Sequence, residues 1–416
     1  MGHFHRVNDD LYCEDVALAR LIKEFGTPLF VYSKAEILDN ISRMRMATKA
    51  ADVELCYSVK ANSNLSILHL MAMQGLGADI VSGGELFRAL QAGISPQKIV
   101  FSGAGKTIDE LRLALQQEIR MFNVESEPEL EALSAVAQSL GKIAPIALRV
   151  NPDIDAGTHH YTTTAKKENK FGLPLATAVE VYKKAHSLPS INPIGVDVHL
   201  GSPILSLEPY SKALEILSPL IEQLRCLGIA ISTLDIGGGY GIVYNNEQPF
   251  TPQQFADLLL PYAKRLQCSC ILEPGRFIMG NSGVLLTTIT YVKKTDAKLF
   301  YICDAGMNDL IRPALYGSFH DIVPVVLNGT GKKTTADIVG PICESSDFFA
   351  KDRSIDCCEQ GASLAVKSAG AYGFSMSSQY NSRPRACEVL VEGSSYACIR
   401  RRETYEDLIS QECIIN

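Results

Sequence analysis

Eight short apolar runs, separated by longer amphipathic stretches, occupy the middle of this 416-residue chain. Amphipathic stretches such as 84–91 and 127–134 lie between the runs. Alternation of strand and helix patterns predicts a parallel sheet, and eight units over roughly 220 residues match a closed (β/α)8 barrel of the TIM type. An open, doubly wound sheet would give the same periodicity and remains the alternative. The runs are 54–59, 77–81, 98–101, 120–124, 145–150, 194–199, 231–236 and 269–272.

After about residue 280 the pattern changes to runs rich in β-branched and aromatic residues, with few long helices. Such runs predict a second, mainly antiparallel β domain, and the length of the chain also favours more than one core. The first thirty residues are too few to form a core of their own. We therefore expect an α/β protein with a barrel over 31–280 and a β domain made of 1–30 and 281–416.

Composition excludes several classes of function. The net charge of -7, without a basic stripe, argues against nucleic-acid binding. No apolar run is long enough to cross a bilayer and the first ten residues contain no hydrophobic signal core, so we expect a cytoplasmic protein without membrane partners. The twelve cysteines show neither a CxxC pair nor zinc spacing, which predicts free thiols and no metal site.

A lysine ends the first apolar run. Alternation of Val53, Leu55, Tyr57 and Val59 predicts a strand, and Lys60 follows it directly. A lysine at a strand end can be a surface residue with a packed stem and a solvated amine. In a dry pocket, however, the amine loses its proton and condenses with an aldehyde. Taken alone, the pattern leaves both interpretations open.

Polar or glycine clusters also follow the last three runs, where barrels collect their active-site residues. Consecutive glycines expose backbone N–H groups to an anion, and the loop after a seventh strand is a frequent phosphate site. These glycines could instead make only a tight turn, and His199 could be a core histidine. Glu273 and Arg276 could form an ordinary ion pair, or serve a cationic ring and an anionic group. The clusters are His199–Ser202, Gly237–Gly239 and Glu273–Arg276.

Two other signals are weaker. The segment 103–107, Gly-Ala-Gly-Lys-Thr, resembles the end of a P-loop, but Val100 stands where that motif needs a glycine. His159 and His160 have no third metal ligand at a suitable spacing. We therefore expect neither a nucleotide site nor a metal site.

Lys60, the glycine run and the turn at 273–276 together resemble the barrel-type, fold-type III pyridoxal-phosphate decarboxylases, and most closely the diaminopimelate decarboxylase family. The resemblance covers nearly the whole chain. It implies an alanine racemase-like architecture and pyridoxal 5'-phosphate as cofactor. It also implies a carboxy-lyase that converts meso-2,6-diaminopimelate to L-lysine and carbon dioxide, the last step of lysine biosynthesis. The matching segments are 25–32, 57–62, 79–86, 151–153, 167–172, 199–202, 343–347, 370–374 and 380–385.

The resemblance implies a role for each cofactor residue. Lys60 would form the internal Schiff base, His199 would stack on the pyridoxal ring, and Glu273 would hydrogen-bond the ring nitrogen. A carboxylate there raises the pKa of the ring nitrogen and keeps the ring a cationic electron sink. The remaining residues would hold or reach the phosphate. They are Ser202, Gly237, Gly238, Gly239, Gly275, Arg276 and Tyr372.

The same resemblance implies a substrate site and a partner. Arg312 would bind the distal carboxylate with its planar fork, and Glu344 would bind the distal ammonium. Cys343, supplied by the partner subunit, would return a proton to the carbanion, so the catalytic residues would be Lys60, His199 and Cys343. A homodimer with shared active sites follows. The substrate residues would be Arg276, Arg312, Tyr316, Glu344 and Tyr372.

Two departures from the family pattern, and three alternative functions, bear on which substrate the chain uses. The family more often has glycine where Ser345 stands and glutamine where Pro203 stands, which leaves loop geometry open. Decarboxylases of ornithine, lysine or arginine are the nearest alternative, but there the cysteine is usually followed by aspartate rather than by a residue like Glu344. Segment 343–347 and the region of Arg385 argue against a racemase of the same cofactor class. A non-catalytic protein on this fold should have lost Lys60 or Cys343.

Overall fold

The computed structural model describes residues 2–157, 170–327 and 331–415. His159 and His160, and residues 167–169 of one matching segment, lie outside this part. The chain divides into two compact units, a barrel unit of 42–242 and 248–277 and a β unit of 1–41, 243–247 and 278–416. Among the described helices, none combines the length and apolar composition that crossing a membrane requires. All twelve cysteines are free thiols.

The barrel unit holds eight parallel strands in a closed ring. Each strand pairs with the next, and the last, β13, pairs in parallel with the first, β5. This closure confirms the predicted (β/α)8 barrel and excludes the open sheet. The strands are β5 (Val53–Ser58), β6 (Gly77–Ile80), β7 (Ile99–Phe101), β8 (Met121–Val124), β9 (Ala144–Asn151), β11 (Ile191–Asp197), β12 (Thr233–Asp235) and β13 (Ser269–Leu272), with the short β10 (Leu173–Pro174) added beside β9.

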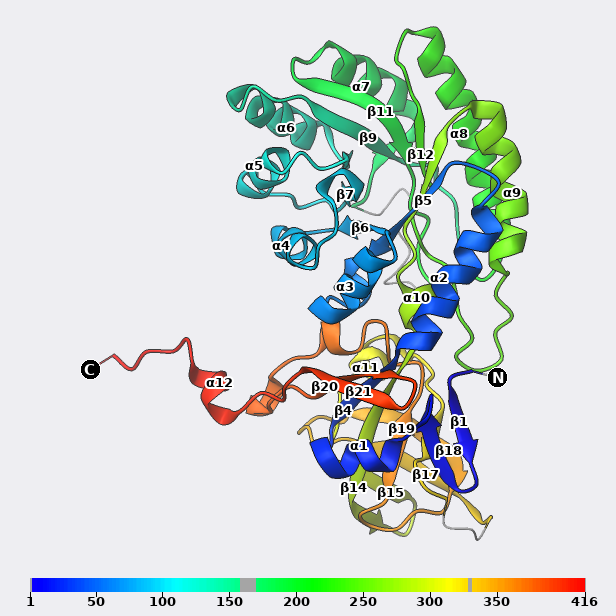
Figure 1. Ribbon diagram of the computed structural model, residues 1–416, viewed down its shortest axis with the longest axis vertical. Helices are drawn as coiled ribbons and strands as arrows, with labels where there is room; N and C mark the ends of the chain where they lie inside the picture. Colours follow the sequence, from blue (N-terminus) through cyan, green and yellow to red (C-terminus); the bar gives the residue numbers. More distant parts are fainter. Residues whose placement is uncertain (1, 158–169, 328–330, 416) are drawn as a thin grey trace. The chain divides into compact units, whose positions relative to one another are not determined.

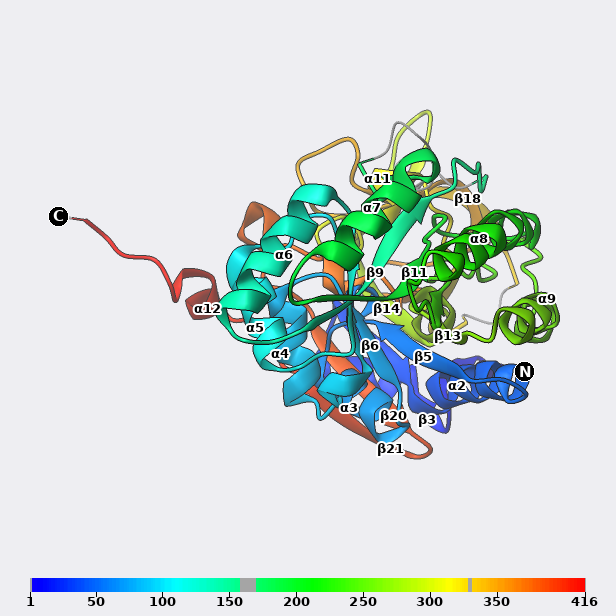
Figure 2. The same cartoon turned by 90° about the horizontal axis from the view of Figure 1, so that it is seen from above.

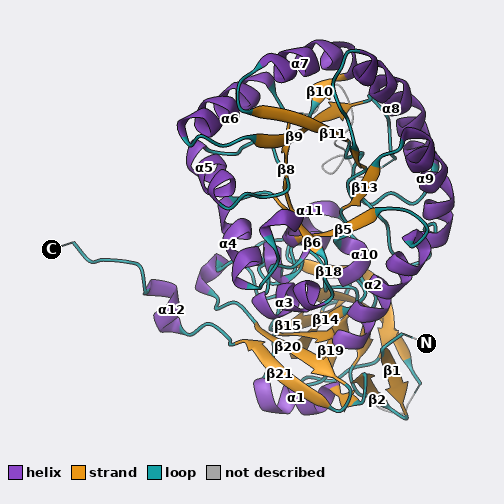
Figure 3. Ribbon diagram, turned by 45° about the horizontal axis from the view of Figure 1, so that its top comes forward, coloured by secondary structure: helices purple, strands orange, loops and turns teal. Residues whose placement is uncertain are grey.

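Helices form an outer ring around these strands (Figures 2 and 3). Several begin at a side-chain cap, which fixes where the preceding loop stops: Ser82 caps α4, and Thr107 and Thr251 make capping boxes with Glu110 and Gln254. The helices are α3 (Leu65–Met73), α4 (Gly83–Gln91), α5 (Ile108–Gln116), α6 (Glu127–Ser139), α7 (Leu175–Ser187), α8 (Glu208–Cys226) and α9 (Pro252–Leu266). Helix α2 (Lys34–Thr48) runs from the β unit into the barrel unit, and α10 (Arg276–Met279) runs back.

The β unit is built on a mixed, mainly antiparallel sheet in the order β18-β17-β15-β14-β4-β20-β21. Among the described strands of this sheet, only the pairs β15–β17 and β4–β20 are parallel. Its strands are β4 (Leu29–Ser33), β14 (Gly283–Lys294), β15 (Leu299–Cys303), β16 (Ile322–Pro324), β17 (Lys333–Val339), β18 (Phe348–Asp356), β19 (Ser363–Val366), β20 (Cys387–Glu392) and β21 (Ser395–Arg400). A small sheet joins β1 (Phe4–Val7), β2 (Asp10–Cys13) and β3 (Val16–Ala17), and the helices are α1 (Leu18–Phe25), α11 (Arg312–Tyr316) and α12 (Tyr405–Ile409).

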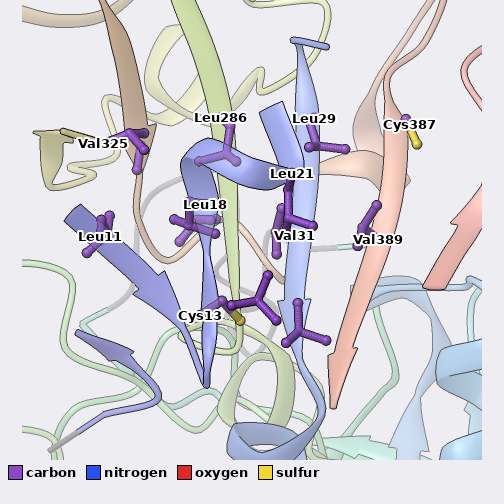
Figure 4. Packing of buried hydrophobic residues seen from close by; sticks show 14 residues of the cluster. Leu11, Cys13, Leu18, Leu21, Leu29, Val31, Leu286, Val325, Cys387 and Val389 are labelled. Atoms are coloured by element: carbon purple, nitrogen blue, oxygen red, sulfur yellow. The ribbon is translucent and has the colours of Figure 1, made fainter. Parts of the chain in front are cut away.

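Strand β4, from the start of the chain, lies between β14 and β20 in this sheet (Figure 1). Its alternate residues Leu29 and Val31 face one core together with Leu286 and Val389 from its neighbours (Figure 4). Leu18 and Leu21 of α1 cover the same core, so the amphipathic face of the first helix is buried there. The N-terminal segment therefore shares its core with strands from the last third of the chain.

Candidate active site

Lys60 lies in a single turn, η1 (Val59–Ala61), directly after β5, and its amine forms an ion pair with Asp79 of β6. Asp79 is fully buried and also accepts a hydrogen bond from the Ser58 hydroxyl at 2.7 Å. One third of the Lys60 side chain remains exposed. The amine is thus held against a buried carboxylate at the carboxyl end of the barrel, which is unlike a solvated surface lysine.

A pocket of about 200 Å³ opens beside this pair. Its lining comes from the carboxyl ends of six barrel strands and the loops that follow them. The predicted residues Lys60, His199 and Glu273 meet here, as expected from their places after three different strands. The full lining is Lys60, Val81, Ser102, Gly103, Arg149, Phe171, Asp197, His199 and Glu273.

His199 is held as a neutral imidazole. The Gly238 N–H donates to its Nδ1 over 3.3 Å, so that nitrogen is an acceptor and the ring proton is assigned to Nε2. Burial, assisted by the charges of Arg149 and Lys60, holds the pKa of His199 well below its usual value. The 3.9 Å between Nδ1 and Glu273 Oε2 is therefore not an ion pair. A flat, uncharged ring results, fixed in orientation by a backbone amide.

The three glycines are required by close approach. A Cβ on Gly238 would lie 2.3 Å from the Glu273 carbonyl oxygen, and one on Gly239 would lie 2.4 Å from the Gly201 carbonyl oxygen. Gly237 has a φ of 67° and donates its N–H to Asp235. The backbone amides of Gly237 and Gly238 thus already donate hydrogen bonds within the protein, to Asp235 and to His199. The Gly239 amide has no hydrogen-bond partner in the part of the chain that the structure describes, so it is the one that can serve an anion.

Arg276 and Ser202, from the loops after β13 and β11, are brought together as predicted. The Arg276 Nε and Nη2 atoms lie 3.3 and 3.2 Å from the Ser202 hydroxyl, and Arg276 is largely buried. Gly275 is also sterically required, because a Cβ there would lie 2.9 Å from the Ser58 Cβ. A guanidinium, a hydroxyl and an amide N–H suit a phosphate group.

Carboxyl groups outnumber cations in the barrel interior. Burial raises the pKa of Glu273 well above its ordinary value, and the charges of Asp235 and Asp79 add to the effect. Burial likewise raises the pKa of Asp197 and Asp235. One oxygen each of Asp79 and Asp197, both Oδ1, has no hydrogen-bond partner among the described residues. A bound cation beside Glu273 would favour its ionised form.

A second buried network supports the same mouth. Arg149 pairs with Glu125 at 2.9 Å and lies over the Phe171 ring. Glu125 also accepts the N–H of Gly103 at 2.9 Å, while its own N–H donates to Glu129. Sequence reasoning missed Asp79, Arg149, Asp197 and Ser102, because each sits in or beside an apolar run. The one sequence signal that could have identified these four residues as site residues was their position at the end of a strand.

The segment 103–107, which resembles the end of a P-loop, has a structural role. The Lys106 amine is completely buried and pairs with Glu129 at 2.7 Å. It also donates to the carbonyl oxygens of Gly103 and Asn123, each at 2.8 Å. The lysine thus ties the loop after β7 to β8 and α6.

In the β unit, the predicted substrate and catalytic residues occupy three places. Arg312 and Tyr316 are the first and last residues of α11, and Arg312 is buried. Cys343 and Glu344 lie in the exposed loop between β17 and β18. Tyr372 has a φ of 57°, a left-handed conformation uncommon for a residue with a side chain.

The loop that carries Cys343 is held by side chains of the segment 380–381 and by one hydrogen bond of its own. The Cys343 N–H and Sγ both lie 3.3 Å from the Asn381 side-chain oxygen, and Glu344 accepts hydrogen bonds from Tyr380 and Ser346. These hydrogen bonds lower the pKa of Glu344 and keep it ionised. Ser345 is not among the residues with positive φ, so this position does not need the glycine that the family more often has.

Comparisons with known proteins agree with this geometry. The family described as pyridoxal-dependent decarboxylase, pyridoxal binding domain, matches residues 34–280. The chain is 47% identical to diaminopimelate decarboxylase of Vibrio cholerae over all of both chains. It is 49% identical to that of Aquifex aeolicus, over 96% of this chain and 95% of the relative.

Solved structures of diaminopimelate decarboxylases are also similar to this chain. Diaminopimelate decarboxylase from Helicobacter pylori, complexed with L-lysine, has a TM-score of 0.92 and 42% identity over 95% of this chain and 99% of that one. The enzyme from M. jannaschii in co-complex with L-lysine has a TM-score of 0.94 and 35% identity, over 99% and 98% of the two chains. A lysine decarboxylase from Selenomonas ruminantium, 22% identical, shares the fold. With full-length relatives at this identity and a barrel mouth that gathers Lys60, His199 and Glu273, the chain belongs to the diaminopimelate decarboxylase family of pyridoxal-dependent decarboxylases.

Proposed function

We propose that this chain is a pyridoxal 5'-phosphate-dependent carboxy-lyase that converts meso-2,6-diaminopimelate to L-lysine and carbon dioxide, the last step of lysine biosynthesis. The observation that carries the proposal is the meeting of Lys60, His199 and Glu273 in one pocket at the barrel mouth. We assign the cofactor to the barrel domain, 31–280. The β domain, 1–30 and 281–416, would contribute substrate residues.

The residues at the barrel mouth fit this cofactor in chemical type. A buried carboxylate next to the Lys60 amine, a neutral His199 ring and an excess of acidic groups near Glu273 suit an aldehyde on a cationic aromatic ring. Ser202, Arg276 and the Gly239 amide suit its phosphate. When bound, pyridoxal phosphate supplies an aldehyde and a protonated pyridine ring that accepts the electrons left by departing carbon dioxide. The residues that would hold it are Lys60, His199, Ser202, Gly237, Gly238, Gly239, Glu273, Gly275, Arg276 and Tyr372.

The chain's own groups prepare this chemistry. Asp79 accepts a hydrogen bond from the Lys60 amine and so places it at the pocket. The Gly238 N–H fixes the plane of the His199 ring through Nδ1. An ionised Glu273 would favour a protonated ring nitrogen by charge attraction. The Lys60 amine is positioned by a carboxylate and the His199 ring by a backbone N–H, as preorganised catalysis requires.

We assign the substrate to residues of the β domain. Arg312 would bind the distal carboxylate, and the ionised Glu344 would bind the distal ammonium, with Tyr316 and Tyr372 as further contacts and Arg276 added from the barrel domain. Cys343 would return a proton to the substrate carbon after decarboxylation. The exposed position of Cys343 and Glu344 supports their use by a second subunit, in a cytoplasmic homodimer with shared sites.

A substrate panel tests the proposal. Purified protein with added pyridoxal phosphate should release carbon dioxide from meso-diaminopimelate and form an equal amount of L-lysine. Ornithine, lysine and arginine, which lack the second amino-acid group, should react far more slowly. Turnover of ornithine without turnover of diaminopimelate would replace this proposal with the alternative of an ornithine, lysine or arginine decarboxylase.

A further inference from the structure

A fully buried histidine touches Arg312 inside the β unit. His320 precedes β16 and has no exposed surface. Its Nε2 lies 2.9 Å from the Arg312 Nη1, and its Nδ1 lies 2.8 Å from the Lys367 carbonyl oxygen. Both ring nitrogens thus have partners of known polarity.

These two partners fix the protonation of the ring. A guanidinium only donates hydrogen bonds, and a carbonyl oxygen only accepts them. Nε2 must therefore be the acceptor and Nδ1 must carry the proton, which describes a neutral imidazole in one tautomer. A doubly protonated ring would point an N–H at the Arg312 guanidinium and place a second positive charge beside it.

Other neighbours hold the same guanidinium. The Arg312 Cζ lies 4.8 Å from the centroid of the Tyr244 ring, and Nη2 donates to the Ser318 hydroxyl at 3.2 Å. The Tyr244 ring also meets the His320 ring edge to face, with centroids 5.4 Å apart. The His320 backbone is fixed in turn, because its carbonyl oxygen accepts a hydrogen bond from Arg353 at 2.9 Å.

His320 is a neutral partner of the Arg312 guanidinium, and that bears on recognition. A carboxylate in place of His320 would pair with the guanidinium and neutralise it. A neutral imidazole satisfies one buried N–H of the guanidinium without neutralising its charge. Resting on the proposed function, we propose that His320 is a positioning residue for substrate specificity: it orients the Arg312 guanidinium for the carboxylate of the distal amino-acid group.

Two competing ligands separate this role from general stability. L-lysine keeps the distal carboxylate, whereas cadaverine is the same diamine without it. Inhibition constants of both are measured against diaminopimelate turnover by the holoenzyme. His320→Phe, which removes the acceptor but keeps a ring, should weaken lysine about tenfold or more, as expected for one hydrogen bond to a charged group. Cadaverine should change less than about twofold, and the KM for diaminopimelate should rise more than kcat falls.

Further variants sharpen the test. His320→Gln keeps an acceptor and should retain more lysine affinity than His320→Phe; it also serves if the phenylalanine variant does not fold. His320→Asp should weaken lysine too, because it neutralises Arg312. Arg312→Met should show the same lysine-specific loss, and the double variant Arg312→Met/His320→Phe should be no worse than Arg312→Met. His186→Gln, at an exposed histidine of the barrel unit, is the control and should change neither constant.

Two results would overturn the inference. One is a parallel change in the lysine and cadaverine constants, which would give His320 a purely structural role. The other is unchanged lysine affinity in both His320→Phe and His320→Gln. Failure of the proposed function looks different, because the unaltered enzyme would then not decarboxylate diaminopimelate at all.

Discussion

At the scale of single residues, the barrel mouth is explained by which neighbours each side chain meets. Lys60, His199 and Glu273 could be predicted, because each stands at the end of a recognisable apolar run. Asp79 and Arg149 could not, because their partners Lys60 and Glu125 follow other strands and no local pattern encodes that pairing. The glycine run was predictable as a turn, but the use of two of its amides by Asp235 and His199 required the fold.

Gly238 offers a direct test of close approach. In Gly238→Ala the new methyl group would meet the Glu273 backbone 2.3 Å away, and backbone cannot move aside cheaply. We expect a loss of about 1–3 kcal/mol in stability and weaker cofactor binding, seen by thermal unfolding and by titration of visible absorbance. Gly105→Ala, where nothing lies within 4 Å of the added group, is the matched control and should change little. Equal behaviour of the two variants would contradict the steric account.

Glu85 provides a test by pH. Burial raises the pKa of Glu85 from its ordinary value of 4.5 to about 7, so the folded chain keeps this proton over a range where the unfolded chain has lost it. Stability contributed by this group therefore falls as pH rises from about 4.5 to about 7. Glu85→Gln keeps an acceptor for the Val81 N–H and should be more stable than the parent above pH 7, by on the order of 1–2 kcal/mol, with no gain near pH 4.5. Melting temperatures of both proteins, in the same cofactor state across this range, give the comparison; a pH-independent difference would contradict it.

At the scale of elements, local periodicity predicted the eight barrel strands, since each unit's strand and helix are adjacent in sequence. It also predicted a β-rich second part. It did not predict the insertion of β4 between β14 and β20, because those partners lie more than 250 residues away from β4 along the chain. Nor did it predict the use of segment 103–107, whose lysine pairs with Glu129 and donates to the carbonyl oxygens of Gly103, in the loop after β7, and Asn123, in β8.

Lys106 should therefore matter for stability rather than for nucleotide binding. Lys106→Met leaves Glu129 buried without its partner, although burial already raises the pKa of that carboxyl. Removing one member of a buried pair costs about 3–5 kcal/mol, and the double variant Lys106→Met/Glu129→Leu should recover part of the loss. Lys142→Met removes an exposed pair with Glu118 and should cost less than about 1 kcal/mol. Denaturant unfolding of the three variants measures this, and a loss at Lys106 no larger than at Lys142 would contradict the network.

At the scale of the whole molecule, the proposed shared site makes assembly part of the activity. After subunit exchange between Lys60→Ala and Cys343→Ala proteins, half of the dimers are mixed and each should hold one intact site. We expect about a quarter of the parent activity to return. Lys60→Ala mixed with Glu273→Ala is the control and should recover nothing, because both residues belong to one barrel. No recovery in the first mixture, with exchange demonstrated, would place Cys343 in the site of its own subunit.

The central claim joins one lysine to one reaction. Carbon dioxide release from carboxyl-labelled meso-diaminopimelate is measured for the parent protein and for Lys60→Ala, both supplied with pyridoxal phosphate and both shown to be folded. The account predicts labelled carbon dioxide and an equal amount of L-lysine from the parent, and a rate lower by several orders of magnitude from Lys60→Ala. Equal rates from the two proteins, or no release from the parent, would contradict it.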